Sequence, residues 1–319
     1  MARVSIVVPT RNRARLLSCT LNSICAQQQV DLEIVVVDDG STDDTARVAA
    51  AADARVRVIR NPRSLGVSAA RNTGIAASRG EWIAFCDDDD LWAPDKLVAQ
   101  LAAAREARAG WVYTGDVSID SRARVFAGSP PAAPDEVTRL LRRENPLASG
   151  GSNVVVRADV LAITGGFDPE LRRTEDWDLW LRLLSTGAPA WVSRPLVAYR
   201  FHPLNIATDV GSMVAEARRL ALRHRIPIDL AAMHRRAAWT ALRAGRRGRA
   251  IGHYARAVAH GDFRSVGRSA FALVHPDVGS DSLFNVVGGD PAWMAEAERW
   301  LTAYVDVAAA APGMEGAPQ

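Results

Sequence analysis

Gly80 to Leu97 reads Gly-Glu-Trp-Ile-Ala-Phe-Cys-Asp-Asp-Asp-Asp-Leu-Trp-Ala-Pro-Asp-Lys-Leu, a stretch that predicts a strand, an acidic loop and a helix in succession. Its apolar run, Trp82 to Cys86, is typical of a strand buried on both faces, and four carboxylates follow it at Asp87 to Asp90. Pro94 suits the first turn of a helix, which the helix formers after it continue. Because ligands of an open α/β sheet bind outside the carboxyl ends of its strands, we expect a binding site at these acids.

The four adjacent carboxylates repel one another, so their place at the end of a buried strand favours a bound cation. A hard divalent ion that also carries phosphate oxygens is the natural candidate. The alternative is a solvated acidic loop that supplies a helix N-cap. We expect the last acid, Asp90, to cap the helix that follows.

The chain before this stretch alternates between short apolar runs and helical periods. The predicted elements are, in order, strand Val4–Val8, helix Arg13–Gln28, strand Leu32–Val37, helix Asp43–Ala52, strand Arg55–Arg60 and helix Ser68–Ser78. Strands that are joined through helices, with little alternation of polar and apolar residues, predict the α/β class. We therefore expect a Rossmann-like, mostly parallel sheet with helices on both faces.

The chain after this stretch is less regular, and its composition changes near Asp209. The predicted elements are strand Trp111–Gly115, a short helix Asp135–Arg143 within the irregular residues 116–150, strand Ser152–Arg157, a helix ending at Gly165-Gly166, helix Thr174–Ser185, and two short strands, Ala190–Ser193 and Leu196–Arg200. Further helices are predicted near Met213–His224, Leu230–Ala244, Arg249–His260 and Pro291–Val305. The shift predicts an α/β domain at 1–208, a helical C-terminal region at 209–307 and a disordered tail at 308–319.

The composition is that of an ordinary globular protein. With 319 residues and 48% hydrophobic content, the chain can form one large core and a smaller appendage. Its three cysteines form no CxxC pair, and Met1 leads into a strand-like run without a signal-peptide pattern, so we expect a reducing, cytoplasmic location. No uncharged apolar run approaches the roughly 20 residues that cross a bilayer.

The net charge of +3 conceals an asymmetry between two parts of the chain. Residues 211–270 hold 13 Arg against 3 Asp or Glu, a balance of +10, which leaves −7 for the remainder by subtraction. An Arg-rich helical segment allows contact with anionic lipid, nucleic acid or a partner, whereas a solvated helix face is the simpler explanation. We expect no nucleic-acid partner and keep peripheral membrane contact as an open alternative.

Five motifs together resemble the family-2 glycosyltransferases of the GT-A fold. They are Ser5-Ile-Val-Val-Pro-Thr-Arg-Asn-Arg13, Val36-Val-Asp-Asp-Gly-Ser41, Ala70-Arg-Asn-Thr-Gly74, Phe85 to Asp90, and Gly165-Gly-Phe-Asp168 with Glu175-Asp-Trp-Asp178. The motifs occur in the order and at the separations usual for the family, and they cover roughly residues 1–205. The C-terminal third lies outside the resemblance.

The resemblance implies a nucleotide-sugar donor and a divalent metal, Mn²⁺ or Mg²⁺. The implied donor-binding residues are Thr10, Arg11, Asp38, Asp39, Arg71, Asp87 and Asp88, and the implied metal ligands are Asp87, Asp89 and His202. Asp39 matches the position that accepts a hydrogen bond from the nucleotide base, and the N–H of uracil needs such an acceptor, which favours a UDP-sugar. A turn before a helix capped by Asp43 is the alternative interpretation of Asp38 and Asp39.

Asp176 matches the general base of the family's inverting members. Displacement at the anomeric carbon requires a base on the face opposite the leaving nucleoside diphosphate. The alternative is that Glu175 and Asp176 only complement the dipole of the helix that they begin. Trp177 and Trp180 are expected in the core, with one face of Trp177 able to line an acceptor cleft.

These residues predict an inverting, metal-assisted glycosyltransferase that uses a UDP-sugar and a small-molecule, glycan or lipid-linked acceptor with a hydroxyl or amine. A nucleotidyltransferase that makes sugar nucleotides is one alternative, but it requires a glycine-rich phosphate loop, and Pro9 to Arg15 contains no Gly. A non-catalytic scaffold is the other, and it would be expected to lack an acid at position 87, 89 or 176, where Asp87, Asp89 and Asp176 are all present.

Overall fold

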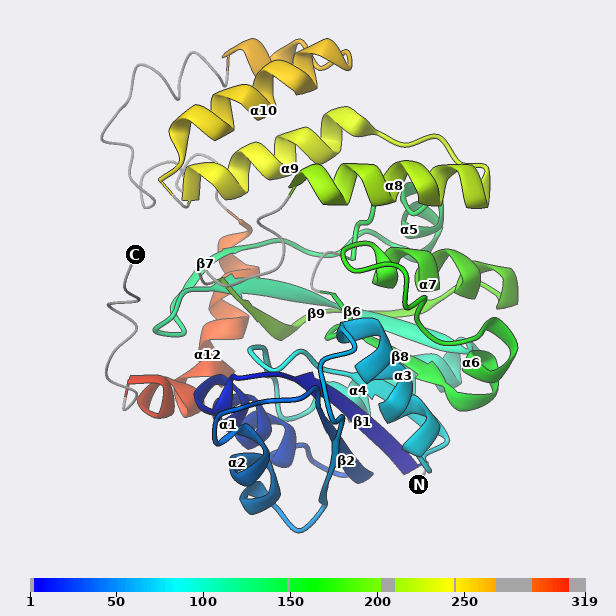
Figure 1. The fold of residues 1–319 in the computed structure, drawn as a ribbon, viewed down its shortest axis with the longest axis vertical. Coiled ribbons are helices and arrows are strands. Elements are labelled where there is room, and N and C mark those ends of the chain that lie inside the picture. Colours follow the sequence, from blue (N-terminus) through cyan, green and yellow to red (C-terminus); the bar gives the residue numbers. More distant parts are fainter. Residues whose placement is uncertain (1–2, 148–149, 202–209, 244, 268–288, 310–319) are drawn as a thin grey trace.

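A nine-stranded mixed sheet forms the centre of the computed structural model, which describes residues 3–147, 150–201, 210–243, 245–267 and 289–309 (Figure 1). The strand order is β3-β2-β1-β4-β8-β6-β9-β5, and β7 pairs with β6 beside this path. The strands are β1 (Arg3–Thr10), β2 (Asp31–Asp38), β3 (Val56–Arg60), β4 (Trp82–Phe85), β5 (Leu91–Trp92), β6 (Trp111–Ile119), β7 (Val125–Gly128), β8 (Val154–Arg157) and β9 (Ala190–Arg200). The helices are α1 (Ala14–Cys25), α2 (Thr45–Ala52), α3 (Val67–Ala77), α4 (Lys96–Glu106), α5 (Pro134–Leu140), α6 (Ala158–Thr164), α7 (Glu175–Leu183), α8 (Val210–His224), α9 (Leu230–Arg243), α10 (Arg247–Ala259) and α12 (Pro291–Ala309), with a 3₁₀ turn at Leu184–Thr186.

The predicted parallel sheet is found in the first half of the chain. Strands β1, β2, β3 and β4 pair in parallel and are joined through helices, as their apolar sequences predict. In the second half β8 lies antiparallel to both β4 and β6, whereas β9 runs parallel to β6. The α/β class with helices on both faces is therefore confirmed, and the sheet is mixed rather than mostly parallel beyond β4.

Two segments depart from the predicted elements for identifiable reasons. The two short strands expected around residues 190–200 form one strand, β9, because Pro195 lies at a shift in register against Gly115 instead of ending the strand. Residues 116–119, expected to be irregular, extend β6, and a turn leads back into β7. Asp120 holds this turn by accepting hydrogen bonds from the backbone N–H groups of Arg122 and Arg124.

Both faces of the sheet are buried. On one face, α1, α2 and α4 cover a core to which Val4, Ile6 and Leu21 belong. On the other, α5, α6 and α7 cover a core that contains Phe85 and Tyr113. Alternate residues of β1 and β4 point into the two cores, which explains why these strands are apolar throughout.

The C-terminal helices occupy two separate places (Figure 1). Helices α8, α9 and α10 stack as a layer over α5 and α7, and Leu220 and Met233 join the core beneath them. Helix α12 lies elsewhere, against β9, β7 and α1. None of the helices in the described ranges is both long enough and apolar enough to cross a membrane.

Helix α12 is part of the packing of the sheet. A Cβ added to Gly115 would overlap the ring of Trp293, so the glycine leaves the space that this indole occupies. Trp293 Nε1 also donates to the carbonyl oxygen of Asp116 at 3.0 Å. The predicted region 209–307 thus contains helices that pack on two different surfaces. Its boundary near residue 208 lies outside the described residues, and α12 ends two residues into the predicted tail, at Ala309.

Candidate active site

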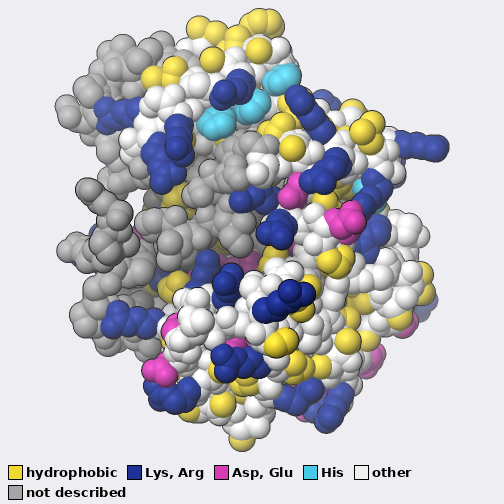
Figure 2. Space-filling model, in the orientation of Figure 1, with side chains coloured by type: hydrophobic (Ala, Val, Ile, Leu, Met, Phe, Trp, Pro, Cys, Tyr) yellow, Lys and Arg dark blue, Asp and Glu magenta, His cyan; other side chains and the backbone are white. Residues whose placement is uncertain are grey.

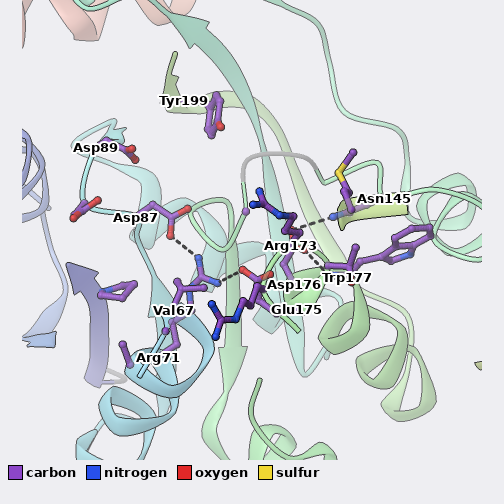
Figure 3. A pocket seen from close by; sticks show the side chains of 18 of the residues that line it. Val67, Arg71, Asp87, Asp89, Asn145, Arg173, Glu175, Asp176, Trp177 and Tyr199 are labelled. Atoms are coloured by element: carbon purple, nitrogen blue, oxygen red, sulfur yellow. Dashed lines mark hydrogen bonds and ion pairs between the residues drawn. The ribbon is translucent and has the colours of Figure 1, made fainter. Parts of the chain in front are cut away.

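One cavity of about 590 Å³ collects most of the predicted site residues (Figure 3). The carboxyl ends of β1, β2 and β4 supply Thr10, Asp39 and Asp87 to its lining. The N-terminal turns of α3 and α7 reach the same space, and α8 and α9 add Met213 and Met233. The cavity therefore lies at the strand ends, where the sequence predicts a binding site, and the C-terminal helices form part of its wall.

Arg71, on α3, connects the two acidic motifs. Its Nη2 donates to Asp87 Oδ1 at 2.6 Å and its Nη1 donates to Glu175 Oε1 at 2.9 Å (Figure 3). Burial opposes the charge of Arg71, but the two carboxylates outweigh burial and raise the pKa of the guanidinium. Arg71, predicted as a donor contact, thus lines the cavity while it holds the strand-end acid against the helix that carries Asp176.

Asp88 and Asp89 are held from the side of β1. Thr10 Oγ1 donates to Asp88 at 2.6 Å, and Arg13 Nη1 donates to Asp88 at 2.8 Å and to Asp89 at 2.7 Å. Burial and then the neighbouring Asp89 raise the pKa of Asp88 to about 7, although Arg13 acts in the opposite direction. Arg13 is therefore a candidate site residue. It is the last residue of the first motif, and the sequence did not predict a role for it.

Asp39 lines the cavity, and its carboxylate is fully engaged with the protein. It accepts hydrogen bonds from Asn61 Nδ2 at 2.8 Å and Ser64 Oγ at 2.7 Å, and from the backbone N–H groups of Leu65 and Gly66 at 2.9 Å. Burial alone would raise the pKa of Asp39, but these donors lower it, the Asn61 amide first among them. Asp39 therefore orders the loop that leads into α3.

Asp38 lies outside the cavity lining, although the sequence predicts it as a donor contact. Its side chain is fully buried, and its Oδ1 accepts a hydrogen bond from the backbone N–H of Ser41 at 2.9 Å. This is the turn that the sequence analysis weighed as the alternative. Arg11 does line the cavity, and its side chain is exposed.

Asp90 does not cap the following helix, so that prediction was wrong. The residue is fully buried, accepts the Ser152 hydroxyl at 2.5 Å and accepts the backbone N–H of Arg200 at 3.1 Å. Helix α4 begins only after Asp95, because β5 comes between the acids and the helix. Burial raises the pKa of Asp90 well above its ordinary value, and the acid ties β4 to β9.

Gly150 brings the loop before β8 against the acids. It has a φ of +56°, and a Cβ at this position would lie 2.8 Å from Asp87 Oδ2. Both the left-handed backbone and the close approach favour glycine here. Gly150 therefore forms a turn and also lines the cavity.

Asp176 lies in the first turn of α7 and faces the same cavity (Figure 3). Its Oδ1 accepts the backbone N–H of Trp177 at 2.7 Å, and its Oδ2 accepts Asn145 Nδ2 at 3.0 Å. Burial and then the neighbouring Glu175 raise the pKa of Asp176 to about 7. A carboxylate with this pKa can accept a proton near neutral pH, which a helix-dipole role does not require.

The two tryptophans of α7 differ in their surroundings. Trp180 is fully buried and stacks on Trp111, with 6.4 Å between the ring centroids, so it belongs to the core. Trp177 is also buried but lines the cavity, and its Nε1 donates to the carbonyl oxygen of Leu141 at 2.7 Å.

The segment before α7 is held by a residue of α8. Glu216 is buried and accepts the backbone N–H groups of Arg172 at 3.1 Å and Arg173 at 2.9 Å. Glu216 and Asn145 are functional candidates that the sequence analysis missed. Neither belongs to a motif, and each contacts the α7 region from more than 30 residues away in the chain.

The residues of the acidic motif suit a hard divalent ion. Asp87 and Asp89 both line the cavity, and carboxylate oxygens are the ligands that Mg²⁺ and Mn²⁺ prefer. Within the described ranges no three His, Cys, Asp or Glu side chains come together as a ligand set. This donor set fits an ion that takes one or two carboxylates from the protein and the remaining ligands from phosphate and water. His202, the third predicted ligand, lies outside the described residues.

Solved structures with the same fold include glycosyltransferases. A crystal structure of S. aureus TarS, residues 1–349, matches with a TM-score of 0.57 and 17% identity over 97% of this chain and 90% of that chain. A mannosyltransferase from Pyrobaculum calidifontis, PcManGT, matches with a TM-score of 0.54 and 21% identity over 97% and 86%. The fold is that of the GT-A glycosyltransferases.

Residues 5–161 match the family described as Glycosyl transferase family 2, so this segment of the chain is that of a glycosyltransferase. The succinoglycan biosynthesis protein ExoO of Rhizobium meliloti is 36% identical over 217 residues, which are 62% of this chain and 60% of that relative. The glucosyltransferase WfgD of Escherichia coli is 29% identical over 184 residues, 57% of this chain and 69% of WfgD. The similarity to ExoO thus spans less than two thirds of that relative's length.

Proposed function

We propose that the protein is a metal-assisted, inverting glycosyltransferase that moves a sugar from a UDP-sugar to the hydroxyl or amine of an acceptor. The observation that carries the proposal is that Asp87 and Asp89 line the same cavity as Asp176, from a different element. Inverting transfer requires such an arrangement, since the diphosphate leaves from one side of the anomeric carbon and the base acts from the other.

The donor half of the cavity comprises the ends of β1, β2 and β4. Thr10 and Arg11 offer a hydroxyl and a guanidinium to the ribose and phosphates. Asp39 accepts the uracil N–H when the Ser64 hydroxyl, the one donor of its four that can rotate freely, turns away. The crystal structure of TarS with UDP-GlcNAc supports a uridine donor, and that of PcManGT with GDP-Man and Mn²⁺ supports the broader class of nucleotide sugars with a metal.

Asp89, with Asp87, would hold the divalent ion. When bound, the ion supplies positive charge to the diphosphate and so assists its departure. Arg13 already bridges Asp88 and Asp89, and this guanidinium keeps the acids close together in the free protein.

Asp176 is the general base of the proposed reaction. The acceptor oxygen forms a bond to the anomeric carbon while the bond from that carbon to the diphosphate oxygen breaks, and Asp176 takes the acceptor's proton. Its pKa of about 7 suits this exchange at neutral pH. The ion pairs of Arg71 with Asp87 and Glu175 fix the position of the strand-end acids relative to α7, which carries Asp176.

The acceptor half of the cavity is formed by α7 together with α8 and α9. Met213 and Met233 line it, and both lie on helices outside the segment that matches the family. Helices outside the family segment can differ between related enzymes, so enzymes with the same donor can bind different acceptors. WfgD is named for an acceptor on diphosphoundecaprenol, so a glycan or lipid-linked acceptor is included in the proposal beside a small molecule.

Calorimetry with UDP tests the donor and metal parts of this proposal. UDP should bind at least about tenfold more tightly with Mn²⁺ than with a chelator, a difference of about 1.4 kcal/mol, and Asp89→Ala should remove the difference. Asp53→Ala is the matched control, because Asp53 pairs with Arg55 and does not line the cavity. Equal UDP affinity with Mn²⁺ and with chelator would contradict the proposed role of the acids.

A further inference from the structure

We propose that Asn145 is a positioning residue for the Asp176 carboxylate and that α9 holds Asn145 in place through Arg236. This inference rests on the proposed function, because it assigns Asn145 a role only through the base. It brings the C-terminal helices into the catalytic apparatus, since Arg236 lies in α9 and Asp176 in α7.

The contacts of Asp176 leave its carboxylate one orientation. Asn145 Nδ2 donates to Oδ2 at 3.0 Å (Figure 3), and the Trp177 backbone N–H donates to Oδ1 at 2.7 Å. Each oxygen therefore has one donor from the protein, and each retains a second acceptor position for the proton of a substrate. Rotation of the carboxylate would break both hydrogen bonds at once.

The amide of Asn145 has a determined orientation. The backbone N–H of Leu147 donates to Asn145 Oδ1 at 3.0 Å, so the carbonyl side of the amide faces Leu147. The NH₂ group must then face Asp176. Asn145 consequently presents a donor to the carboxylate in every state in which the Leu147 contact is kept.

The backbone of Asn145 is held from α9. Arg236 Nη1 donates to the carbonyl oxygen of Asn145 at 2.9 Å. The same segment is fixed at two further points, because the backbone N–H of Asp229 donates to the Arg143 carbonyl oxygen at 2.9 Å, and the Trp177 indole donates to that of Leu141 at 2.7 Å. Residues 141–147 thus bridge α7 and the start of α9.

This bridge affects the chemistry of the base as well as its place. Burial and the charge of Glu175 favour the protonated form of Asp176. The Trp177 N–H, the charge of Arg71 and the hydrogen bond from Asn145 favour the ionised form. Asn145 therefore keeps the base ionised over a wider pH range than its burial alone would allow. A residue that served packing alone would not have this effect.

The test measures the titration of Asp176 in the full chain without ligand. The ¹³Cγ signal of Asp176, assigned by its loss in Asp176→Asn, is followed against pH in wild type and in Asn145→Ala. We expect the midpoint to rise by about one to two pH units in the variant, the effect of losing one hydrogen bond to a charged group. The pH profile of kcat, with the donor identified by calorimetry, should move in the same direction.

Two arginines on one helix provide a variant and its matched control. Arg236→Gln should raise the midpoint by less than Asn145→Ala does, because it loosens the backbone of Asn145 without removing the donor. Arg235→Gln should leave the midpoint unchanged, since Arg235 pairs with Asp262 at 3.2 Å and does not line the cavity. Arg236 is exposed, so its replacement also keeps the test valid if Asn145→Ala folds poorly.

The outcomes separate this inference from the proposed function. A midpoint unchanged in both Asn145→Ala and Arg236→Gln would overturn the positioning role while the glycosyltransferase proposal stands. A wild-type rate in Asp176→Asn would instead overturn the base assignment, whatever the titration shows.

Discussion

At Asp176, two sets of neighbours act on one carboxylate in opposite directions. Burial and the charge of Glu175 raise its pKa to about 7, although the Trp177 N–H, the charge of Arg71 and the Asn145 amide act in the opposite direction. The related acid Asp39 lies in a loop rich in donors, and its pKa is lowered instead. Two aspartates in one cavity are thus suited to different tasks, one to exchanging a proton and the other to accepting hydrogen bonds as an anion.

Replacement of Asp176, the proposed base, should separate catalysis from binding. Asp176→Asn should reduce turnover by about a hundredfold to ten-thousandfold, the usual effect of removing a general base, while UDP affinity changes little. Single-turnover transfer and calorimetry on the same preparation measure the two quantities.

The neighbouring amide supplies a strict control for this change. In Asp176→Asn the NH₂ of the new amide must face either the Asn145 amide or the Trp177 N–H, both of which are donors, so a lower rate alone does not separate loss of the base from local distortion. The double variant Asn145→Asp with Asp176→Asn restores a donor and an acceptor across the pair but leaves the carboxylate on the other side. It should fold normally and remain inactive, and recovered activity would show that the position of the carboxylate does not matter.

Three histidines of the helical layer stack in a row, which we call the histidine ladder. They are His234 of α9, His253 of α10 and His260, the residue that follows α10. The ring of His234 stacks between those of His253 and His260, with centroids 5.5 Å and 5.7 Å away. Figure 2 shows histidine side chains in a row on the part of this face where arginine side chains are also common. Burial, and then His253 and His260, lower the pKa of His234 to about 4, with Arg256 and Arg218 acting in the same direction.

This ladder should make the helical layer sensitive to acid. The folded-state pKa of His234 lies below its value in an unfolded chain, about 6.5, so the unfolded state takes up a proton first as the pH falls. The free energy of unfolding should therefore decrease between about pH 6.5 and pH 4. Melting temperatures of wild type and His234→Gln at pH 7.5 and pH 5 check this, and the variant should lose less stability on acidification.

The exposed end of the ladder gives a graded comparison. His260 is more exposed than His234, so His260→Gln should change the pH dependence less. Equal acid sensitivity in wild type and His234→Gln would show that other groups cause the loss.

At the scale of the whole molecule, the basic C-terminal segment forms ion pairs with the acidic remainder of the chain. Arg223 of the basic segment pairs with Asp168 at 2.5 Å, and His224 contacts Asp178 at 2.8 Å. Helix α8 also contributes an acidic contact, because Glu216 accepts backbone N–H groups just before α7. Basic residues of α8 therefore attach the C-terminal helices to acids of the α/β domain, beside the motif that contains Asp176.

Removal of the Glu216 contact should test this docking. Glu216→Ala leaves two backbone N–H groups without their acceptor, so the free energy of unfolding should fall by about 1–3 kcal/mol. Turnover should fall as well, because the segment leading to Asp176 loses its anchor. Thermal denaturation and transfer rates measure both effects.

Glu298→Ala, on the exposed side of α12, is the matched control and should change neither quantity. A Glu216→Ala protein as stable as wild type would mean that other contacts of α8 are sufficient for docking.

Local patterns in the sequence predict the α/β class, the parallel strands β1 to β4, and the place of Thr10, Arg11, Asp39, Asp87 and Asp89 at the carboxyl edge of the sheet. These patterns are apolar runs that end in polar residues. Asp176 lies in the first turn of a helix, and only the family resemblance added it to this set. The helices of the C-terminal region could likewise be predicted, because their apolar period is local.

Which of the acids line the cavity and which stabilise the surrounding fold depends on tertiary contacts. Asp38 and Asp90 belong to the same acidic motifs as Asp39 and Asp89, but hydrogen bonds from Ser41 and Ser152 place them in a turn and in the core. The bridge from α9 to Asp176 through Asn145 could not be predicted from the sequence either, because Asn145 lies 31 residues from Asp176 and 91 residues from Arg236. A hydrogen bond between distant residues leaves no periodic pattern in a single sequence, and folding alone brings its donor and acceptor together.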